Sequence, residues 1–241
     1  MTAKKQPLPY KMVAGVVPCP GGWLVLPAKL QGVTILPEEP FVLEKLADVL
    51  DYRPSFTVMT LDAPVGLRDE PGDRFRQCDL DAREILGWPR RVQVPPAPSR
   101  AALYAKSFDE AKKLDPWLTE LYYRHFRHYR EVDEEMQPFR QRSVYSANPE
   151  LCFYLLNLDQ PMKYSRHWDV GFQEREELLK LKFPGIDAYF KKDPPEGASR
   201  RHIVDAGAIL WTARRISGRV VQRLPQDPEW DEKSLRMEIV R

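Results

Sequence analysis

The chain has 241 residues, of which 43% are apolar and 30% are charged, and its formal net charge is +2. This composition is typical of a globular protein, and the small positive charge excludes a strongly basic nucleic-acid-binding chain, so any nucleic-acid contact must be local. No apolar run reaches 18 residues, so we expect no transmembrane helix and no membrane partner. Three widely spaced cysteines match neither a disulfide framework nor a zinc knuckle, which favours a reduced, cytoplasmic protein.

The N-terminal part predicts strands followed by one helix. Three short strands with tight turns, typical of an antiparallel meander, are predicted over residues 12–17, 23–27 and 32–36. Residues 41–50 have the apolar spacing of an amphipathic helix, and residues 56–62 form an apolar run that predicts a strand ending in Asp62. This order lets the strand at 56–62 lie parallel to the first strand, and it is not a Rossmann alternation.

The rest of the chain predicts mostly helices. They span residues 72–86, 101–114, 117–136, 149–158, 171–182 and 201–217. Residues 89–98 contain four prolines and predict a stiff loop, and residues 143–147 predict a fifth strand. We see no repeat and no linker composition. The sequence therefore predicts a single domain over residues 1–241 with a helical insertion at 101–137.

Three acids are candidates for catalysis. Asp62 ends a predicted strand, and ligands of open α/β sheets bind at the carboxyl ends of strands. Glu150 follows Asn148-Pro149 beyond another strand, and Asp205 lies in the first turns of the last helix among small residues. Alternatives remain open, because Asp62 suits a turn and the other two acids suit the positive end of a helix dipole.

Together, these acids suit divalent-metal chemistry. Phosphoryl-transfer nucleases commonly hold two Mg²⁺ ions about 4 Å apart, and Mg²⁺ prefers carboxylates, water and phosphate oxygens. We expect Asp62 and Asp205 to be the metal ligands, with Mg²⁺ or Mn²⁺ as the cofactor if the protein is active. The sequence shows no P-loop, nucleophile elbow or dinucleotide-binding motif.

Basic and aromatic residues alternate over residues 122–130, as they do in proteins that bind single-stranded nucleic acid. Helical spacing favours a core stripe over this interpretation. The stripe contains Leu118, Leu121, Tyr122, Phe126 and Tyr129. His128 then falls on a solvated face with Arg124 and Arg127. No cysteine or acid pattern completes a zinc site with the histidines of this stretch.

Six motifs in order resemble a family of uncharacterised proteins, filed as a domain of unknown function, that are predicted to be RNase H-like nucleases. The family's G-V-D-G-C-x-G-G-W corresponds to Gly15–Trp23, its D-x-P-x-G-L is intact at Asp62–Leu67, and its R-x-C-D-x-x-A-R is intact at Arg76–Arg83. The remaining motifs are a P-A-P-x-R loop ending at Arg100, a P-E pair ending at Glu150, and the last helix with Asp205 and Thr212-Ala213.

The resemblance implies an α/β fold of the RNase H-like class, a mixed five-stranded sheet flanked by helices. It also implies a metal-dependent nuclease that hydrolyses phosphodiester bonds, with nucleic acid as the partner. In such a nuclease the catalytic residues would be Asp62, Glu150 and Asp205. The candidates for phosphate contact are Arg76, Arg83, Arg91 and Arg100, because arginine offers a bidentate fork. Ion pairing with Asp79, Asp81 and Glu84 is their alternative role.

Departures from the family pattern weaken the implied metal site. Val17 stands where the family has its first-strand acid, and Ser146 replaces an acid four residues before Glu150. Paired acids ahead of Asp205 are replaced by Arg201 and His202. We therefore expect impaired or lost catalysis. A module that binds nucleic acid or protein without catalysis is the alternative.

Overall fold

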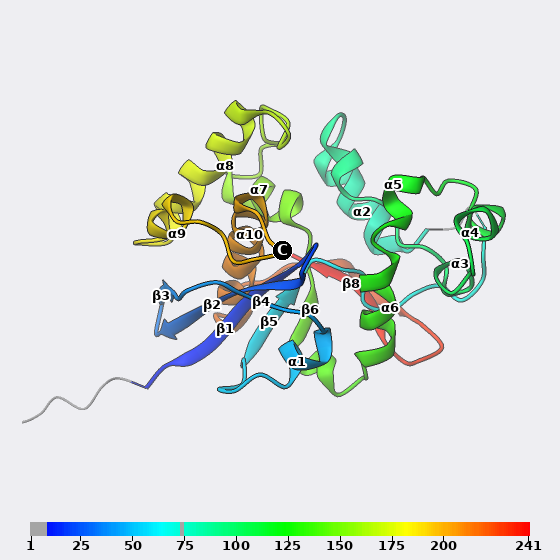
Figure 1. The fold of residues 1–241 in the computed structure, drawn as a ribbon, viewed down its shortest axis with the longest axis horizontal. Helices are drawn as coiled ribbons and strands as arrows, with labels where there is room; N and C mark the ends of the chain where they lie inside the picture. Colours follow the sequence, from blue (N-terminus) through cyan, green and yellow to red (C-terminus); the bar gives the residue numbers. More distant parts are fainter. Residues whose placement is uncertain (1–8, 73–74) are drawn as a thin grey trace, which may run out of the picture.

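The structure is a computed structural model that describes residues 9–72 and 75–241. Within this part of the chain the central element is a mixed six-stranded sheet with the order β3-β2-β1-β5-β6, in which β4 also pairs with β2. The strands are β1 (Lys11–Cys19), β2 (Gly22–Gln31), β3 (Thr34–Pro37), β4 (Phe41–Leu43), β5 (Val58–Leu61) and β6 (Val144–Ser146). Figure 1 shows the sheet at the centre of the molecule with helices on both sides.

The directions of β1, β2 and β5 follow the prediction. β1 is antiparallel to β2 and parallel to β5, and β5 is parallel to β6. The sixth strand was not predicted, because residues 41–50 were expected to form one helix. That expectation is wrong for the first half, where β4 pairs with β2 through Val42 and Leu24, and only α1 (Leu46–Leu50) is helical.

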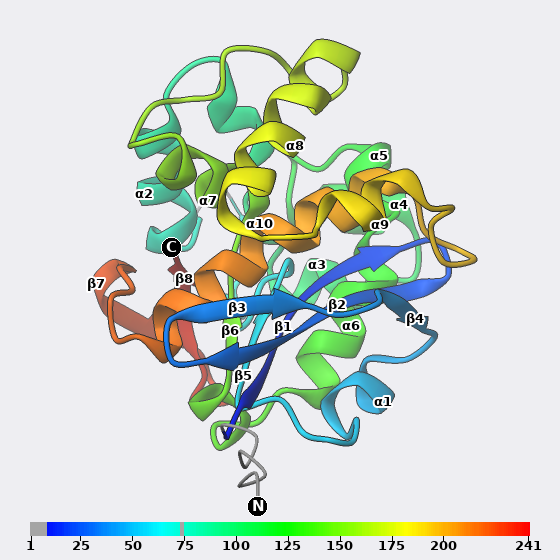
Figure 2. The same cartoon turned by 90° about the vertical axis from the view of Figure 1, so that its left-hand side faces the viewer.

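Helices cover both faces of the sheet (Figures 1 and 2). One face packs against α7 (Pro149–Leu156), α8 (Asp169–Lys182), α9 (Asp187–Lys191) and α10 (Arg200–Ser217). The other face packs against α1, α3 (Arg100–Leu103), α4 (Phe108–Leu114), α5 (Glu120–Tyr123) and α6 (Phe126–Glu135). Alternate residues of β1 point to opposite faces of the sheet. Val13 and Val17 belong to the core beneath α10, and Ala14 and Val16 belong to the core beneath α6.

α10 lies directly on β1 at Gly15. A Cβ atom at this position would lie 2.2 Å from the carbonyl oxygen of Ala206 and 2.8 Å from the backbone nitrogen of Leu210. A side chain of any size would separate the helix from the strand. The sequence therefore fixes the close approach of α10, which carries Asp205, to the strand that ends near Val17.

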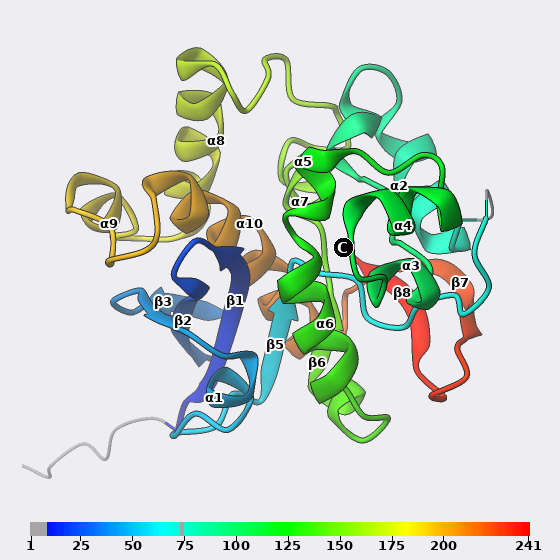
Figure 3. The same cartoon turned by 45° about the vertical axis from the view of Figure 1, so that its right-hand side comes forward.

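The helices of the predicted insertion are shorter than expected. Figure 3 shows them beside α2 (Gln77–Leu86) and the hairpin of β7 (Arg223–Trp230) and β8 (Arg236–Val240). Residues 101–114 form α3 and α4, with Ser107 capping the second helix, and residues 117–136 form α5 and α6. Of the predicted stripe, Leu121 is 70% exposed, whereas His128, expected in solvent, is 5% exposed. Both expectations were wrong.

The remaining elements of the described chain are α2, two 3₁₀ helices and a C-terminal hairpin. α2 (Gln77–Leu86) begins later than the predicted helix at 72–86, of which residues 73–74 lie outside the described residues, as do residues 1–8 of the predicted domain. Short 3₁₀ helices are η1 (Arg90–Gln93) and η2 (Arg140–Arg142). The hairpin of β7 (Arg223–Trp230) and β8 (Arg236–Val240), which was not predicted, packs on α2 through Ile239. None of the described helices is long and apolar enough to cross a membrane.

Candidate functional site

The carboxyl ends of β1, β5 and β6 meet at one edge of the sheet. Val16 pairs with Leu61, and the backbone N–H of Asp62 donates to the carbonyl oxygen of Val16 at 2.9 Å. Val17 and Asp62 therefore lie side by side where the two strands end, as predicted. Ser146 at the end of β6 pairs with Leu61 from the other side.

A cleft of about 700 Å³ opens at this edge. Val17 and Asp62 line it at the strand ends, and Asp205 reaches it from α10. One wall comes from α2, residues 92–97, α5 and α6, and the other comes from residues 166–167 and the start of α10. In Figure 1, α2, α5 and α6 lie on one side of this edge of the sheet and α10 lies on the other. The predicted convergence of Asp62 and Asp205 on one cleft beside the proline-rich loop is confirmed.

Both aspartates lie in surroundings that disfavour their charged forms. Burial, and secondly the nearby charge of Asp205, raise the pKa of Asp62 from 3.8 to about 7, while Arg166 acts in the opposite direction. Burial also raises the pKa of Asp205, which Arg166 again opposes. At neutral pH the cleft therefore carries less negative charge than two aspartates would supply.

Arg166 is the cation that faces these acids. Its Nη2 atom lies 2.5 Å from Oδ2 of Asp205, in a pair whose side chains are 27% and 9% exposed. Charge-assisted hydrogen bonds of this kind are among the stronger polar contacts in proteins. The guanidinium group therefore supplies at Asp205 the positive charge that a divalent ion would bring.

The donor set does not fit Mg²⁺ or Mn²⁺. Mg²⁺ requires near-ideal octahedral oxygen ligation, yet no three His, Cys, Asp or Glu side chains of residues 9–72 and 75–241 form a group that could hold a metal ion. Val17 offers no oxygen in its side chain. Ser146 donates its hydroxyl to the carbonyl oxygen of Ala63 at 2.8 Å. Asp62 and Asp205 remain two acids facing a guanidinium group.

His202 also lines the cleft. Its Nδ1 atom accepts the backbone N–H of Ser199 at 2.9 Å and thereby caps the start of α10. Burial and the charge of Arg166 lower the pKa of His202 to about 4, so the imidazole is neutral at pH 7. Arg201 donates to the carbonyl oxygen of His167 at 3.2 Å.

Glu150 is engaged away from the cleft. It lies in the first turn of α7, which Asn148 caps, and it is 2% exposed. Nη2 of Arg175 bonds both of its carboxylate oxygens, at 2.7 and 2.8 Å, and Arg90 lies 3.9 Å away. Glu150 is absent from the described residues that line the cleft, so its predicted position at the rim was wrong. The glutamate of Pro149-Glu150 thus belongs to a buried ion pair.

Arg76 lines the cleft, but its guanidinium group is already bonded. It donates to both carboxylate oxygens of Asp79, at 3.0 and 2.6 Å, and to the carbonyl oxygens of Val65 and Gly66. The side chains of Arg76 and Asp79 are 3% and 1% exposed. This is the ion-pairing alternative considered from the sequence, and it leaves few donors for a phosphate.

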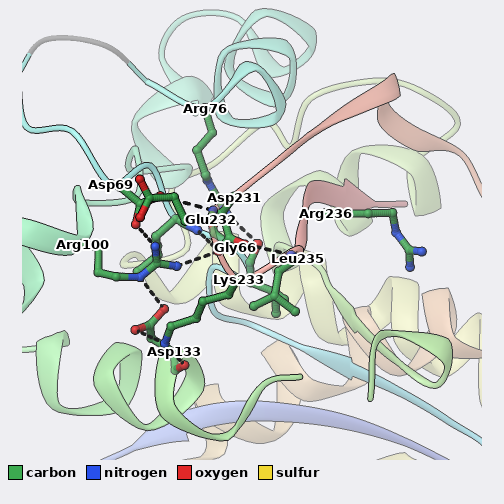
Figure 4. Close-up of polar contacts among 12 residues, drawn as sticks. Gly66, Asp69, Arg76, Arg100, Asp133, Asp231, Glu232, Lys233, Leu235 and Arg236 are labelled. Carbon is green, nitrogen blue, oxygen red and sulfur yellow. Dashed lines mark hydrogen bonds and ion pairs between the residues drawn. The ribbon is translucent and has the colours of Figure 1, made fainter. Parts of the chain in front are cut away.

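Arg100 belongs to a separate buried network, shown in Figure 4. Its guanidinium group contacts Asp69, lies 3.1 Å from Asp133 and lies 2.6 Å from Asp231. Asp231 in turn accepts the backbone N–H of Leu235 at 2.8 Å, within the β7–β8 turn. Arg100 thus joins α3, α6 and the C-terminal hairpin, and it is absent from the described residues that line the cleft.

Of the other two arginines predicted to contact phosphate, one lines the cleft and one does not. Arg83 lines the cleft and donates to the carbonyl oxygens of Arg91 and Val94, at 3.2 and 2.7 Å. Arg91 is exposed and lies over the ring of Trp88 at 5.7 Å, outside the cleft lining. Of these two, Arg83 is therefore the better placed for a ligand in the cleft.

Aromatic side chains form part of one wall. Phe75 and Trp117 meet edge to face at 5.7 Å, and Trp117 lies 5.5 Å from Tyr122. Phe75 and Trp117 are half-buried, so parts of their rings face the cleft, whereas Tyr122 is buried. The cleft thus combines an aromatic wall with an opposite wall that carries Arg166.

Sequence reasoning missed Arg166 and the aromatic wall. Arg166 lies between α7 and α8 in a segment without helical or strand periodicity, so spacing gives no sign that it reaches Asp205. The only available signal was the basic and aromatic content of residues 164–168, since loops carry much of the function of a fold. Trp117 was assigned to a helix without any role.

One comparison with known proteins gives a match. The sequence model of a family described as Protein of unknown function (DUF429) matches residues 15–230. No curated protein and no solved structure matches the chain.

Proposed function

The chain belongs to the family Protein of unknown function (DUF429), and we propose that this member is an RNase H-like protein that binds single-stranded nucleic acid without metal-dependent cleavage. Support for the RNase H-like fold comes from the strand order. Three antiparallel strands, β1 to β3, are followed by β5 and β6, which are parallel to β1. The resemblance seen in the sequence implies the same order.

Loss of metal chemistry is supported by a single observation, the ion pair of Arg166 with Asp205. A divalent cation at Asp205 would have to displace the guanidinium group and would then lie beside a second positive charge. Val17 removes the acid that would compensate for this repulsion. Phosphodiester cleavage through Mg²⁺ therefore lacks a free carboxylate at Asp205 and the required negative charge.

Binding of a nucleic-acid strand is supported by the side chains on the two walls of the cleft. Half-buried Phe75 and Trp117 offer aromatic surface on which a base can stack, and such stacking contributes about 1–3 kcal/mol per base. Arg83 and Arg166 offer guanidinium N–H donors for the phosphate groups. A cleft of about 700 Å³ suits an unpaired segment better than a duplex, whose bases are already stacked on one another.

Metal-dependent cleavage is the competing function, and one observation favours it. No hydrogen-bond donor within residues 9–72 and 75–241 reaches the carboxylate of Asp62, which therefore stands ready for a ligand. In that function Asp62 and Asp205 would hold Mg²⁺ or Mn²⁺ after Arg166 moved to the substrate phosphate.

A cleavage assay separates the two functions. Labelled single-stranded DNA, single-stranded RNA and an RNA–DNA hybrid are incubated with the protein and Mg²⁺ or Mn²⁺. We expect no cleavage, or very slow cleavage, and no saturable heat when Mn²⁺ is titrated into the protein. The double variant Val17→Asp, Arg166→Gln should gain Mn²⁺ affinity, because it adds one acid and removes one guanidinium group. Rapid cleavage by the unmodified protein that is abolished in Asp62→Ala would establish the nuclease.

A binding assay tests whether single-stranded nucleic acid binds in the cleft. Fluorescence anisotropy should show tighter binding of single strands than of duplexes of the same sequence, and binding should weaken as salt rises. Trp117→Leu should reduce affinity by about 1–3 kcal/mol if a base stacks there. Arg91→Gln is the matched control for Arg83→Gln, since Arg91 is exposed outside the cleft lining. Equal effects of the two arginine substitutions would contradict binding in the cleft.

A further inference from the structure

Among the described residues, three aspartates line the cleft, and they differ in what their carboxylates contact. Asp79 accepts guanidinium N–H groups of Arg76 on both oxygens, at 2.6 and 3.0 Å. Asp205 is paired with Arg166 at 2.5 Å. The carboxylate of Asp62 alone receives no hydrogen bond from the part of the chain that the structure describes. A ligand in the cleft therefore engages Asp62 without breaking an existing contact.

The carboxylate of Asp62 is accessible, and its backbone is held in place. The residue is partly buried, yet neither carboxylate oxygen is among the described polar atoms that are fully buried without a partner, so a ligand in the cleft reaches both. Asp62 directly follows β5, and its backbone N–H donates to the carbonyl oxygen of Val16 at 2.9 Å. The end of the strand thus presents two acceptor oxygens to the cleft from a fixed position.

An ionised carboxylate selects the donor pattern of its ligand. Both oxygens accept and neither donates, so the matching group has two adjacent N–H donors that point the same way. In a single strand the Watson–Crick edges of the bases are free to be read. Guanine offers two adjacent N–H donors on this edge, at N1 and N2. Adenine and cytosine place an acceptor beside their donor, and thymine and uracil place one donor between two carbonyl oxygens. An ionised carboxylate therefore favours guanine.

We propose that the cleft selects single strands with an unpaired guanine, whose N1–H and N2–H groups donate to the two carboxylate oxygens of Asp62. This inference rests on the proposed binding of single-stranded nucleic acid in the cleft. It divides the work between the described side chains. Trp117 stacks on a base, Arg83 and Arg166 contact phosphate groups, and Asp62 reads the edge of the base. Stacking and phosphate contacts carry little sequence information, whereas the contact with Asp62 supplies it.

Oligothymidylates that carry one central replacement base test the proposal with the unmodified protein. Fluorescence anisotropy is measured at pH 8, above the pKa of about 7 for Asp62, so that the carboxylate is ionised. We expect a central guanine to bind about tenfold more tightly than a central adenine or thymine, as a bidentate contact to a base does. 7-Deazaguanine keeps the same Watson–Crick edge and should bind as guanine does. N1-methylguanine and hypoxanthine each lack one of the two donors and should lose most of the preference. Equal affinities for guanine and N1-methylguanine would overturn the proposal.

A free guanine nucleotide offers the same base edge, so guanosine monophosphate is tested as a separate ligand. It lacks the flanking nucleotides and should bind more weakly than the oligonucleotide with a central guanine. An equal affinity for the nucleotide would overturn the selection of a strand.

Asp62→Asn tests the residue itself. The amide supplies one acceptor and one donor in place of two acceptors, so the ratio of the affinities for central guanine and central adenine should fall to about that of a contact without discrimination. Asp109→Asn is the matched control, because Asp109 is an exposed aspartate on α4 outside the cleft lining, and it should keep the ratio of the unmodified protein. A guanine preference that survives Asp62→Asn would overturn the contact.

Failure of this inference is distinguishable from failure of the proposed function. Oligothymidylate binding that Trp117→Leu weakens, without any preference for guanine, would refute the reading of guanine and leave the binding of single strands intact. Absence of binding to every oligonucleotide would refute both.

Discussion

Replacing Arg100 with methionine tests whether this motif arginine serves the fold or a ligand. The guanidinium group contacts Asp69, Asp133 and Asp231, and the side chains of the last two are 2% and 0% exposed. Methionine keeps the aliphatic volume and removes the charge. Asp133 retains Lys233 at 2.7 Å, whereas Asp231 keeps only backbone donors among its described contacts, the N–H groups of Leu67 and Leu235.

The size of the effect follows from this difference. Removing one partner of a buried ion pair costs about 3–5 kcal/mol, because the remaining charge is buried without compensation. Asp231 is in that situation, and the partly exposed Asp69 adds little. A chain of 241 residues unfolds with an entropy of about 0.5 kcal/mol/K, so the melting temperature should fall by about 6–10 °C.

Thermal and urea unfolding of Arg100→Met measure this loss, with Arg91→Met as the control. Arg91 is exposed and meets only the ring of Trp88 among its described side-chain contacts, so its replacement should change the stability by less than about 0.5 kcal/mol. Binding of a single strand by Arg100→Met should remain unchanged at temperatures where the variant is folded. Unchanged stability together with lost strand binding would refute the structural role and support the phosphate contact predicted from the sequence.

Three further outcomes are expected. The pKa of Asp62 is raised to about 7, so the folded protein keeps a proton that the unfolded chain releases near pH 4. The free energy of unfolding should therefore fall as pH rises from about 4 to 7. Asp62→Asn cannot ionise and should lack this fall, which thermal melts at pH 5 and 8 would measure. Arg175→Met should cost about 3–5 kcal/mol in urea unfolding, since it leaves Glu150 buried, and an effect below about 1 kcal/mol would argue against this pair as a structural element. Gly15→Ala should lower the melting temperature of the protein far more than Gly207→Ala. The new Cβ atom meets backbone atoms at Gly15, whereas at Gly207 it meets the flexible end of Leu179. Equal melting temperatures of the two variants would contradict the close packing of α10 on β1.

Part of the fold could be predicted because local signals agree with the final pairing. Strands β1 to β3 are apolar runs separated by turns, and β5 is an apolar run that ends in Asp62. β4 could not be recognised, because Phe41 and Leu43 fit a helical stripe equally well and only the pairing with β2 decides between the two. β7 contains Pro225 and Pro228 and is largely exposed, so it lacks the alternation of a strand.

The candidate site was predictable only where a strand end or a family motif marks it. Asp62 follows a strand, and Asp205 lies in a matched helix, so their meeting could be inferred. Glu150 carries the same kind of motif, yet Arg175, 25 residues further along the chain, holds it away from the cleft. Arg166 is 39 residues from its partner Asp205 in an irregular segment. Such pairings depend on tertiary packing, which residue spacing does not encode.

The direct contact between β1 and α10 at Gly15 has an evolutionary consequence. It holds the backbones that carry Val17 and Asp205 at a fixed separation, so this edge of the sheet cannot adapt its chemistry by sliding the helix along the strand. Arg166, by contrast, comes from the irregular segment between α7 and α8, outside this contact. A single codon change there would alter the charge at Asp205 while the scaffold stayed intact. Relatives with this fold could thus gain or lose a cation at the site without repacking α10 on β1.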